Sequence, residues 1–130
     1  MTYRVAYDMS QEQLPDAQSV GDFLDRRAKR IAPHGRRANA YWFAPADTQD
    51  ELRLDLDYDA GRAALRWLPD RTHAVELDPA EPIIVLESSD TDVVTIPAEL
   101  VRVSIDTARR AVIEYVATGQ RPTCVHWATD

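Results

Sequence analysis

Residues 51–67 read ELRLDLDYDAGRAALRW, and apolar and polar side chains alternate there on both sides of one short turn. An alternation with a period of two predicts β-strands that have one apolar and one polar face. With the turn placed at Ala60 and Gly61, Asp55 lies opposite Arg66 on the polar side. We therefore expect an antiparallel hairpin whose leucines face a core and whose aspartates and arginines face water.

The polar side of this hairpin has two interpretations. Cross-strand Asp–Arg pairs are common solubilising devices, worth about 0.2–1 kcal/mol each, and a run of charges is usually a solvated face. The alternative is a partner-binding face with an aromatic anchor from the nearby YWF segment, where Tyr41 and Phe43 lie opposite Trp42. The candidate partner-binding side chains on the hairpin and in the later SSDTD loop are Asp55, Asp57, Asp59, Arg66, Asp90 and Asp92.

The period of two extends beyond the hairpin in both directions. It predicts a first strand from Thr2 and further strands at residues 38–44, 72–78 and 82–88, and it allows a short strand at residues 93–96. The connections between these strands are short and turn-like. An antiparallel meander is therefore expected in the middle of the chain.

Two segments have the helical spacing of apolar side chains instead. The first runs from an N-cap at Ser19 to Ile31, and the second follows an N-cap at Ser104 and ends at Gly119. Strand, helix, meander, helix and strand in this order predict an α+β fold. We expect an antiparallel β-meander sheet with two helices packed on one face and a C-terminal strand, residues 123–127, returning to the sheet.

The composition is that of an ordinary globular protein. Of 130 residues, 45% are hydrophobic and 28% charged, which suits one domain spanning residues 1–130. The 22 Asp and Glu against 15 Lys and Arg give a net charge of −7. This charge argues against direct binding of nucleic acid, whose affinity comes largely from Lys and Arg. It suits a basic partner, or it serves solubility alone.

The sequence indicates a cytoplasmic protein. Its single cysteine, Cys124, excludes an internal disulfide and is typical of a reducing compartment. The first residues show no basic leader followed by an apolar run. No segment approaches the roughly 18–20 apolar residues of a membrane helix, so no membrane partner is expected.

No sequence motif supports catalysis, a metal or a cofactor. The chain lacks HExxH, CxxC and Gly-rich phosphate loops. Cys124 and His126 project to the same side of the last strand without an activating arrangement, and a packed, inert Cys124 is expected. We predict no catalytic residue, no metal and no cofactor. The alternative is a small cytoplasmic α+β hydrolase or isomerase with a pocket between helices and sheet.

The end of the chain carries a family resemblance. Residues 103–127, VSIDTARRAVIEYVATGQRPTCVHW, combine an apolar helix with an aromatic near its end, then T-G-x-x-P, then a short strand ending in V-x-W. This pattern resembles the C-terminal signature of the first-numbered Imm family, immunity proteins of bacterial polymorphic toxin systems. The match is clearest over residues 95–127, and the matching residues are Ala108, Val112, Tyr115, Thr118, Gly119, Pro122, Val125 and Trp127.

The resemblance implies a protein that binds and neutralises a cognate secreted toxin domain. Toxins of such systems include nucleic-acid deaminases and nucleases, and their immunity proteins commonly cover the active-site region. The acidic balance agrees, because a toxin that handles nucleic acid tends to have a basic cleft. A regulatory protein-binding module is the remaining alternative. We assign a scaffold role to the motif residues Tyr115, Gly119, Pro122, Val125 and Trp127.

Overall fold

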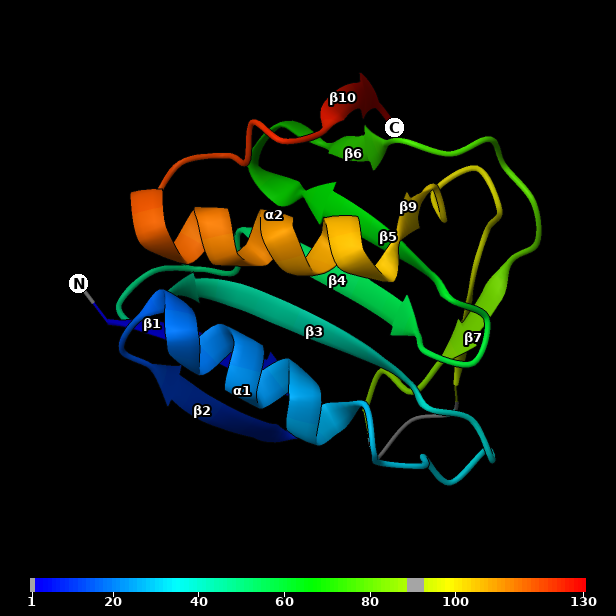
Figure 1. The fold of residues 1–130 in the computed structure, drawn as a ribbon, viewed down its shortest axis with the longest axis horizontal. Coiled ribbons are helices and arrows are strands. Elements are labelled where there is room, and N and C mark those ends of the chain that lie inside the picture. The colour runs from blue at the N-terminus through cyan, green and yellow to red at the C-terminus, as the bar shows by residue number, and fades with distance from the viewer. Residues whose placement is uncertain (1, 89–92) are drawn as a thin grey trace.

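The computed structural model describes residues 2–88 and 93–130 of the chain. An open, mostly antiparallel sheet carries two helices on one face, which confirms the predicted α+β class (Figure 1). The elements in chain order are β1 Tyr3–Tyr7, β2 Ser10–Leu14, α1 Ala17–Arg27, β3 Ala38–Pro45, β4 Leu52–Asp57, β5 Arg62–Trp67, the 3-10 turn η1 Leu68–Asp70, β6 Thr72–Val75, β7 Ile83–Val85, β8 Val94–Ile96, β9 Val103–Ser104, α2 Ile105–Thr118 and β10 His126–Thr129.

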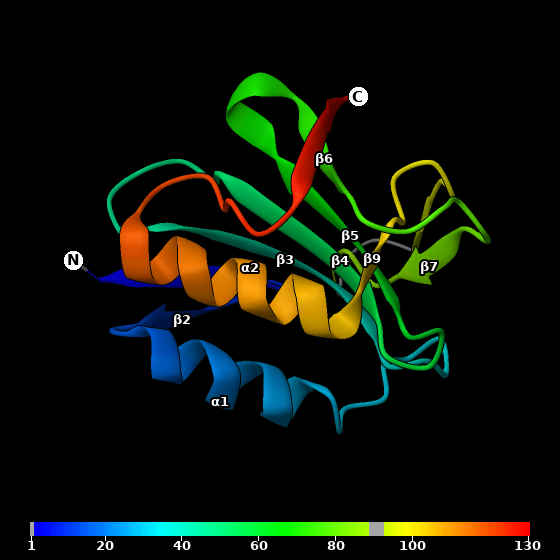
Figure 2. The same ribbon diagram turned by 45° about the horizontal axis from the view of Figure 1, so that its top comes forward.

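The strand order across the main sheet is β10-β6-β5-β4-β3-β1-β2, and β9 pairs with β5. The segment from β3 to β6 forms four strands of the predicted meander, but the predicted fifth strand, residues 82–88, leaves the main sheet as β7; the C-terminal strand β10 returns beside β6 as expected. Strands β7 and β8 form a separate two-stranded sheet. Both helices run along the same side of the main sheet and lie next to each other (Figure 2).

The hairpin of β4 and β5 has a different register from the predicted one. Leu54 pairs with Leu65 and Asp57 with Arg62, a shift of two residues that leaves every side chain on its predicted face. The cause is the turn, because the Asp57 carboxylate accepts the backbone N–H groups of Asp59 and Ala60, at 2.9 and 3.0 Å. Because of this Asx-type turn, Arg62 pairs with Asp57 and not with Asp59, so the ladder on β4 ends two residues earlier than predicted.

The first helix begins earlier and ends earlier than predicted. Its N-cap is Asp16, whose carboxylate accepts the backbone N–H of Ser19 at 2.9 Å, while the Ser19 hydroxyl reaches back to the Asp16 N–H. Ser19 is therefore the third helical residue and not the cap. The helix ends at Arg27, so Ile31 lies in the following loop and is 67% exposed instead of joining the apolar face.

Strand β2 was not predicted. Of its five residues, SQEQL, only Leu14 is buried, so the segment carries no apolar alternation. Asp8 and Met9 connect it to β1 with φ angles of 48° and 63°, the left-handed values that two-residue hairpin turns require. Pairing with β1 therefore makes this segment a strand.

The C-terminal strand begins at His126, three residues later than the predicted start. Val125 and Trp127 pack against the main core and His126 is exposed, as predicted. Trp127 is only partly buried, and its indole N–H donates to the Pro122 carbonyl at 2.8 Å. Cys124 is exposed in the preceding turn, so the prediction of a packed cysteine was wrong.

Candidate functional site

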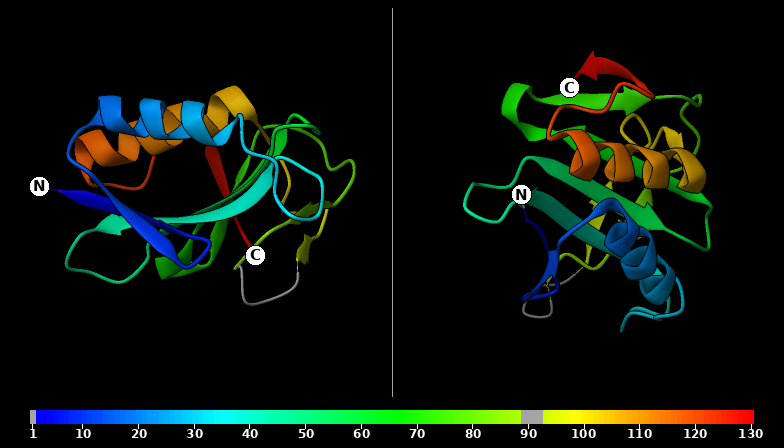
Figure 3. Two further views of the ribbon diagram at one scale, coloured as in Figure 1. Left: turned by 90° about the horizontal axis from the view of Figure 1, so that it is seen from below. Right: turned by 60° about the vertical axis from the view of Figure 1, so that its left-hand side comes forward.

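The face of the main sheet opposite the helices, which we call the second face, holds the predicted site. Part of it is covered by β7 and β8, which lie on the side of the sheet away from the helices (Figure 3). Their side chains pack on three alanines of the sheet and form a second apolar cluster. Its buried members are Ala38, Ala40, Ala64, Ile83, Val85, Ile96 and Val101.

A row of large polar and aromatic side chains crosses the second face in register. Trp42 on β3 pairs with Arg53 on β4, Arg53 with Arg66 on β5, and Arg66 with His73 on β6. The Arg53 guanidinium carbon lies 4.7 Å from the centre of the Trp42 ring, a cation–π contact. Residues directly opposite on neighbouring strands point the same way, so these four side chains form one continuous row.

Asp55 lies on the same face, two residues after Arg53 on β4, and is completely buried. Its Oδ1 accepts from Arg53 Nη2 at 2.9 Å, and its Oδ2 accepts from Arg66 Nη2 at 2.8 Å. Arg53 Nη2 also donates to Glu87 Oε2 at 2.9 Å. Burial would lower the pKa of the Arg53 guanidinium, but its hydrogen bonds to Asp55 and Glu87 raise that pKa above its ordinary value.

The expectation that Asp55 faces water is therefore wrong. The alternation predicted the correct face, but strands β7 and β8 and the long arginine side chains cover it. The two arginines and two carboxylates of this cluster balance in charge, which a largely buried group of ions requires. We call Arg53, Asp55, Arg66 and Glu87 the ion cluster.

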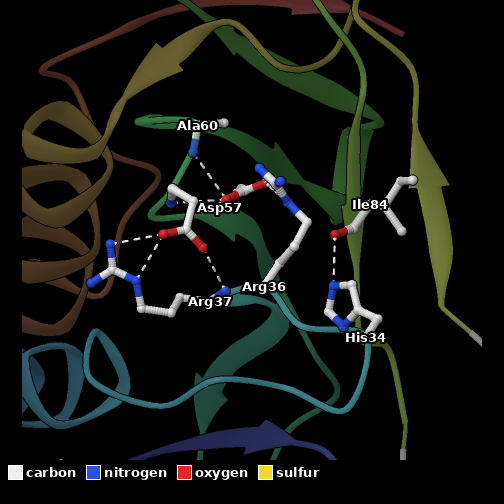
Figure 4. A network of polar contacts seen from close by, with 7 residues as sticks. His34, Arg36, Arg37, Asp57, Ala60 and Ile84 are labelled. Atoms are coloured by element: carbon white, nitrogen blue, oxygen red, sulfur yellow. Dashed lines mark hydrogen bonds and ion pairs between the residues drawn. The ribbon is translucent and has the colours of Figure 1, made fainter.

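Asp57 is also buried, at 1% exposure, and it too was expected to face water. Arg36 donates to its Oδ2 from Nε and Nη2, at 2.9 and 2.7 Å, while the backbone N–H groups of the hairpin turn occupy Oδ1 (Figure 4). Both oxygens are thus engaged within the protein. Asp57 builds the turn and joins it to the loop that follows α1.

Asp59 remains at the surface, at the tip of the same turn. It accepts from the backbone N–H of Arg37 at 2.9 Å and from its Nε at 3.0 Å, and these bonds lower the pKa of the Asp59 carboxyl. In the same loop, the His34 ring Nε2 lies 3.1 Å from the Ile84 carbonyl oxygen (Figure 4). The loop after α1 is therefore tied to both the hairpin turn and β7.

The structure thus divides the predicted site residues into three groups. Asp55 and Asp57 are internal, Asp59 and Arg66 reach the surface, and Asp90 and Asp92 lie outside the described residues. Asp55 and Arg66 are in contact as predicted, but diagonally, because Ala64 is the residue opposite Asp55. Sequence reasoning did not select Arg53 and Glu87. Arg53 lies two residues before Asp55 on the same strand, so the alternation places both side chains on the same face. That was the available signal.

His73 and Cys124 are chemically active side chains that lie outside the ion cluster. His73 is buried, and its Nδ1 lies 2.8 Å from Oδ1 of the exposed Asp130. Local desolvation and the Glu114 carboxylate raise the pKa of the Cys124 thiol, which disfavours the nucleophilic thiolate. Within residues 2–88 and 93–130, no three His, Cys, Asp or Glu side chains are grouped to hold a metal ion. No helix in these ranges has the length and apolar character to span a bilayer.

Comparison with models of known protein families gives a match over nearly the whole chain. The family model described as "Immunity protein Imm1" matches residues 8–129. The match thus includes the N-terminal half, beyond the C-terminal pattern. No curated protein matches the sequence.

Proposed function

Since this chain belongs to the Imm1 family of immunity proteins, we propose that it binds a cognate secreted toxin domain in the cytoplasm and neutralises it. The family match over residues 8–129 is the observation that carries this proposal. Neutralisation by binding needs no catalytic group, no metal and no cofactor on this chain. The protein acts as a single binding domain, without touching nucleic acid or membrane.

The toxin is proposed to be a nucleic-acid deaminase or nuclease whose active-site region is covered. The net charge of −7 supports this, because an enzyme that binds phosphates presents a basic cleft that an acidic protein can occupy. Opposite fields also speed the encounter of two proteins. Fast association suits an inhibitor that must act before the toxin reaches its substrate.

The second face is the proposed contact surface. Trp42 and Arg66 are of the residue types that dominate binding energy, and both are partly exposed. Asp55 holds Arg66 in place, which lowers the entropy lost when a partner binds. Asp55 and Asp57 therefore act indirectly, by positioning the arginines. Asp59 is proposed as a direct contact at one end of this surface.

Asp90 and Asp92 remain proposed contacts on sequence grounds. In the chain they follow β7 and Glu87, one of the two carboxylates of the ion cluster. Their two carboxylates would add to the negative charge that a basic toxin meets.

Co-expression with the cognate toxin domain tests the proposed function. Cells carrying both proteins should survive, whereas survival no better than with an empty vector would refute it. The contact surface is tested by Trp42→Ala, which should weaken toxin binding by about 30-fold or more if Trp42 is an anchor. Ile31→Ala, an equally apolar change on an exposed loop, is the matched control and should leave affinity unchanged.

A further inference from the structure

Another polar site lies at the C-terminal end of α2, away from the second face. There the helix end meets the start of β1 and the loop between β3 and β4 (Figures 1 and 2). A cavity of about 390 Å³ opens at this point, lined by Tyr3, Pro45, Glu51 and residues 116–120. None of these residues belongs to the ion cluster.

The Glu51 carboxylate is only half used by the protein. Its Oε2 accepts the Tyr115 hydroxyl at 2.7 Å, and its Oε1 has no hydrogen-bond partner among the described residues. Glu51 is partly buried and lines the cavity, so its carboxylate is only partly solvated there. A partly desolvated carboxylate oxygen gains most from a charged donor.

The last turn of α2 adds more acceptors. Gly119 ends the helix at φ 72° and its N–H bonds to the Tyr115 carbonyl at 2.7 Å, while the Gln120 N–H turns to the Thr118 hydroxyl at 3.2 Å. No backbone N–H within the described ranges bonds to the carbonyls of residues 116–118 from beyond the helix. These carbonyls form the negative end of the helix dipole, equivalent to about half an elementary charge.

Tyr3 adds a further polar group to the cavity wall. Its side chain is only 4% exposed, yet its hydroxyl makes no hydrogen bond to any residue in 2–88 or 93–130. This hydroxyl lines the cavity and reaches so close to Gly119 that a Cβ there would lie 2.8 Å from it. Because solvent still reaches this hydroxyl from the cavity, a group that enters the cavity can replace water as its hydrogen-bond partner.

We infer that this cavity receives an arginine side chain of the protein partner, an inference that rests on the proposed binding function. Its free polar atoms are Glu51 Oε1, three helix carbonyls and the Tyr3 hydroxyl, and all of them can accept hydrogen bonds. They match the five donors of a guanidinium better than the three of an ammonium. The charge of Glu51 and the negative helix end exclude an anion.

The neighbouring cationic side chain, Arg4, does not bind in this cavity. Arg4 lies at the same end of the sheet, but its guanidinium is bound by Asp50 Oδ1 at 2.7 Å and by the Thr48 carbonyl at 2.8 Å. No ion pair joins Arg4 to Glu51 in the part of the chain that the structure describes. The charge of Glu51 is therefore available to a partner.

Titration with a small probe tests this site without any toxin. N-acetyl-arginine amide added to the ¹⁵N-labelled protein should shift the amide resonances of residues 118–120 in a saturable way. N-acetyl-citrulline amide, which has the same shape without the charge, should not. The shifts should disappear in Glu51→Gln and persist in Asp47→Asn, which removes a charge from the same loop. Absent shifts, or equal shifts with citrulline, would overturn the inference.

The same variants in the toxin complex separate this inference from the proposed function. Glu51→Gln should weaken toxin binding by about 30-fold or more, and Asp47→Asn by less than about 3-fold. In Glu51→Gln the amide oxygen can still accept a hydrogen bond from Tyr115, and an unchanged urea midpoint confirms that this variant is folded. Tyr3→Phe, which removes only the Tyr3 hydroxyl, is the second variant. If the wild type neutralises the toxin and Glu51→Gln binds as well as Asp47→Asn, the arginine site alone is refuted. If the wild type does not neutralise it, the proposed function fails, whatever the probe titration shows.

Discussion

Replacing Asp55 with asparagine should destabilise the protein strongly. Asp55 is completely buried, and it is held by Arg53 and Arg66, whose side chains are 14% and 19% exposed. Asparagine keeps the size of the side chain but removes the charge. Arg53 would then keep Glu87 as its partner, whereas Arg66 would lose its one ion-pair partner among the described residues. Loss of one member of a buried ion pair typically costs about 3–5 kcal/mol.

This cost is a large part of the total stability of a domain, which is usually about 5–15 kcal/mol. For a chain of this length, we expect the melting temperature to fall by about 10–20 °C. Urea denaturation followed by tryptophan fluorescence gives the free energy of unfolding directly. Trp42, whose ring lies 4.7 Å from the Arg53 guanidinium, also reports on the cluster itself. Asp59→Asn is the matched control, and the exposure of Asp59 predicts little change.

A second step tests the cause of the loss. Asp55→Asn and Arg66→Gln should be strongly coupled in a double-mutant cycle, because each removes the partner of the other. Replacing Arg53, Asp55 and Arg66 together with Met, Leu and Met should recover much of the lost stability, since the one charge left, on Glu87, is 35% exposed to water. If Asp55→Asn changes the free energy of unfolding by less than about 1 kcal/mol, the reasoning about the ion cluster is wrong.

Three further predictions concern the C-terminal third. Trp127→Ala should cost about 2 kcal/mol in urea denaturation, less than the roughly 3–5 kcal/mol of a fully buried Trp, because the ring is half-buried and bonds to Pro122; an unchanged midpoint would contradict this. Gly119→Ala should destabilise by about 1–2 kcal/mol through its φ of 72° and its contact with Tyr3, and Tyr3→Phe should recover part of that loss; strictly additive effects would exclude the contact. Burial and Glu51 raise the pKa of Tyr115 above 10.0, so its contribution to stability is complete below pH 10 and is lost as the pH rises beyond it; urea midpoints from about pH 8 to 11 should fall less in Tyr115→Phe, and an identical fall would disprove this.

The hairpin shows how far the sequence could predict the fold. Alternation determines which side chains share a face, and a register error of two residues preserves that assignment. It carries no information about what covers a face. Strands β7 and β8 approach the second face because Ala38, Ala40 and Ala64 are small, and this packing joins segments far apart in the chain. Three alanines on one polar face were the available signal for a covered surface.

The turn shows a different limit. Ala60 and Gly61 form the expected dipeptide, yet the Asp57 side chain determines the turn by accepting two backbone N–H groups. Asp57 can be buried in this role only because Arg36, from a loop about twenty residues earlier in the chain, neutralises it. Local rules describe the Asx turn. The neutralising partner follows from the tertiary fold alone.

The position of the charges connects the two proposed contact sites. Asp55 and Asp57 are paired inside the protein, so they contribute little to the field that a partner meets at a distance. In the loop beside the arginine cavity, Asp50 is paired with Arg4, but Asp47 and Glu51 form no ion pair within the described residues and leave net negative charge there. A basic toxin should therefore be attracted first to this end of the sheet. Its association rate should fall steeply with salt in the wild type and less steeply once Asp47 and Asp50 are replaced with asparagine; the same salt dependence in both proteins would show that this loop does not steer the encounter.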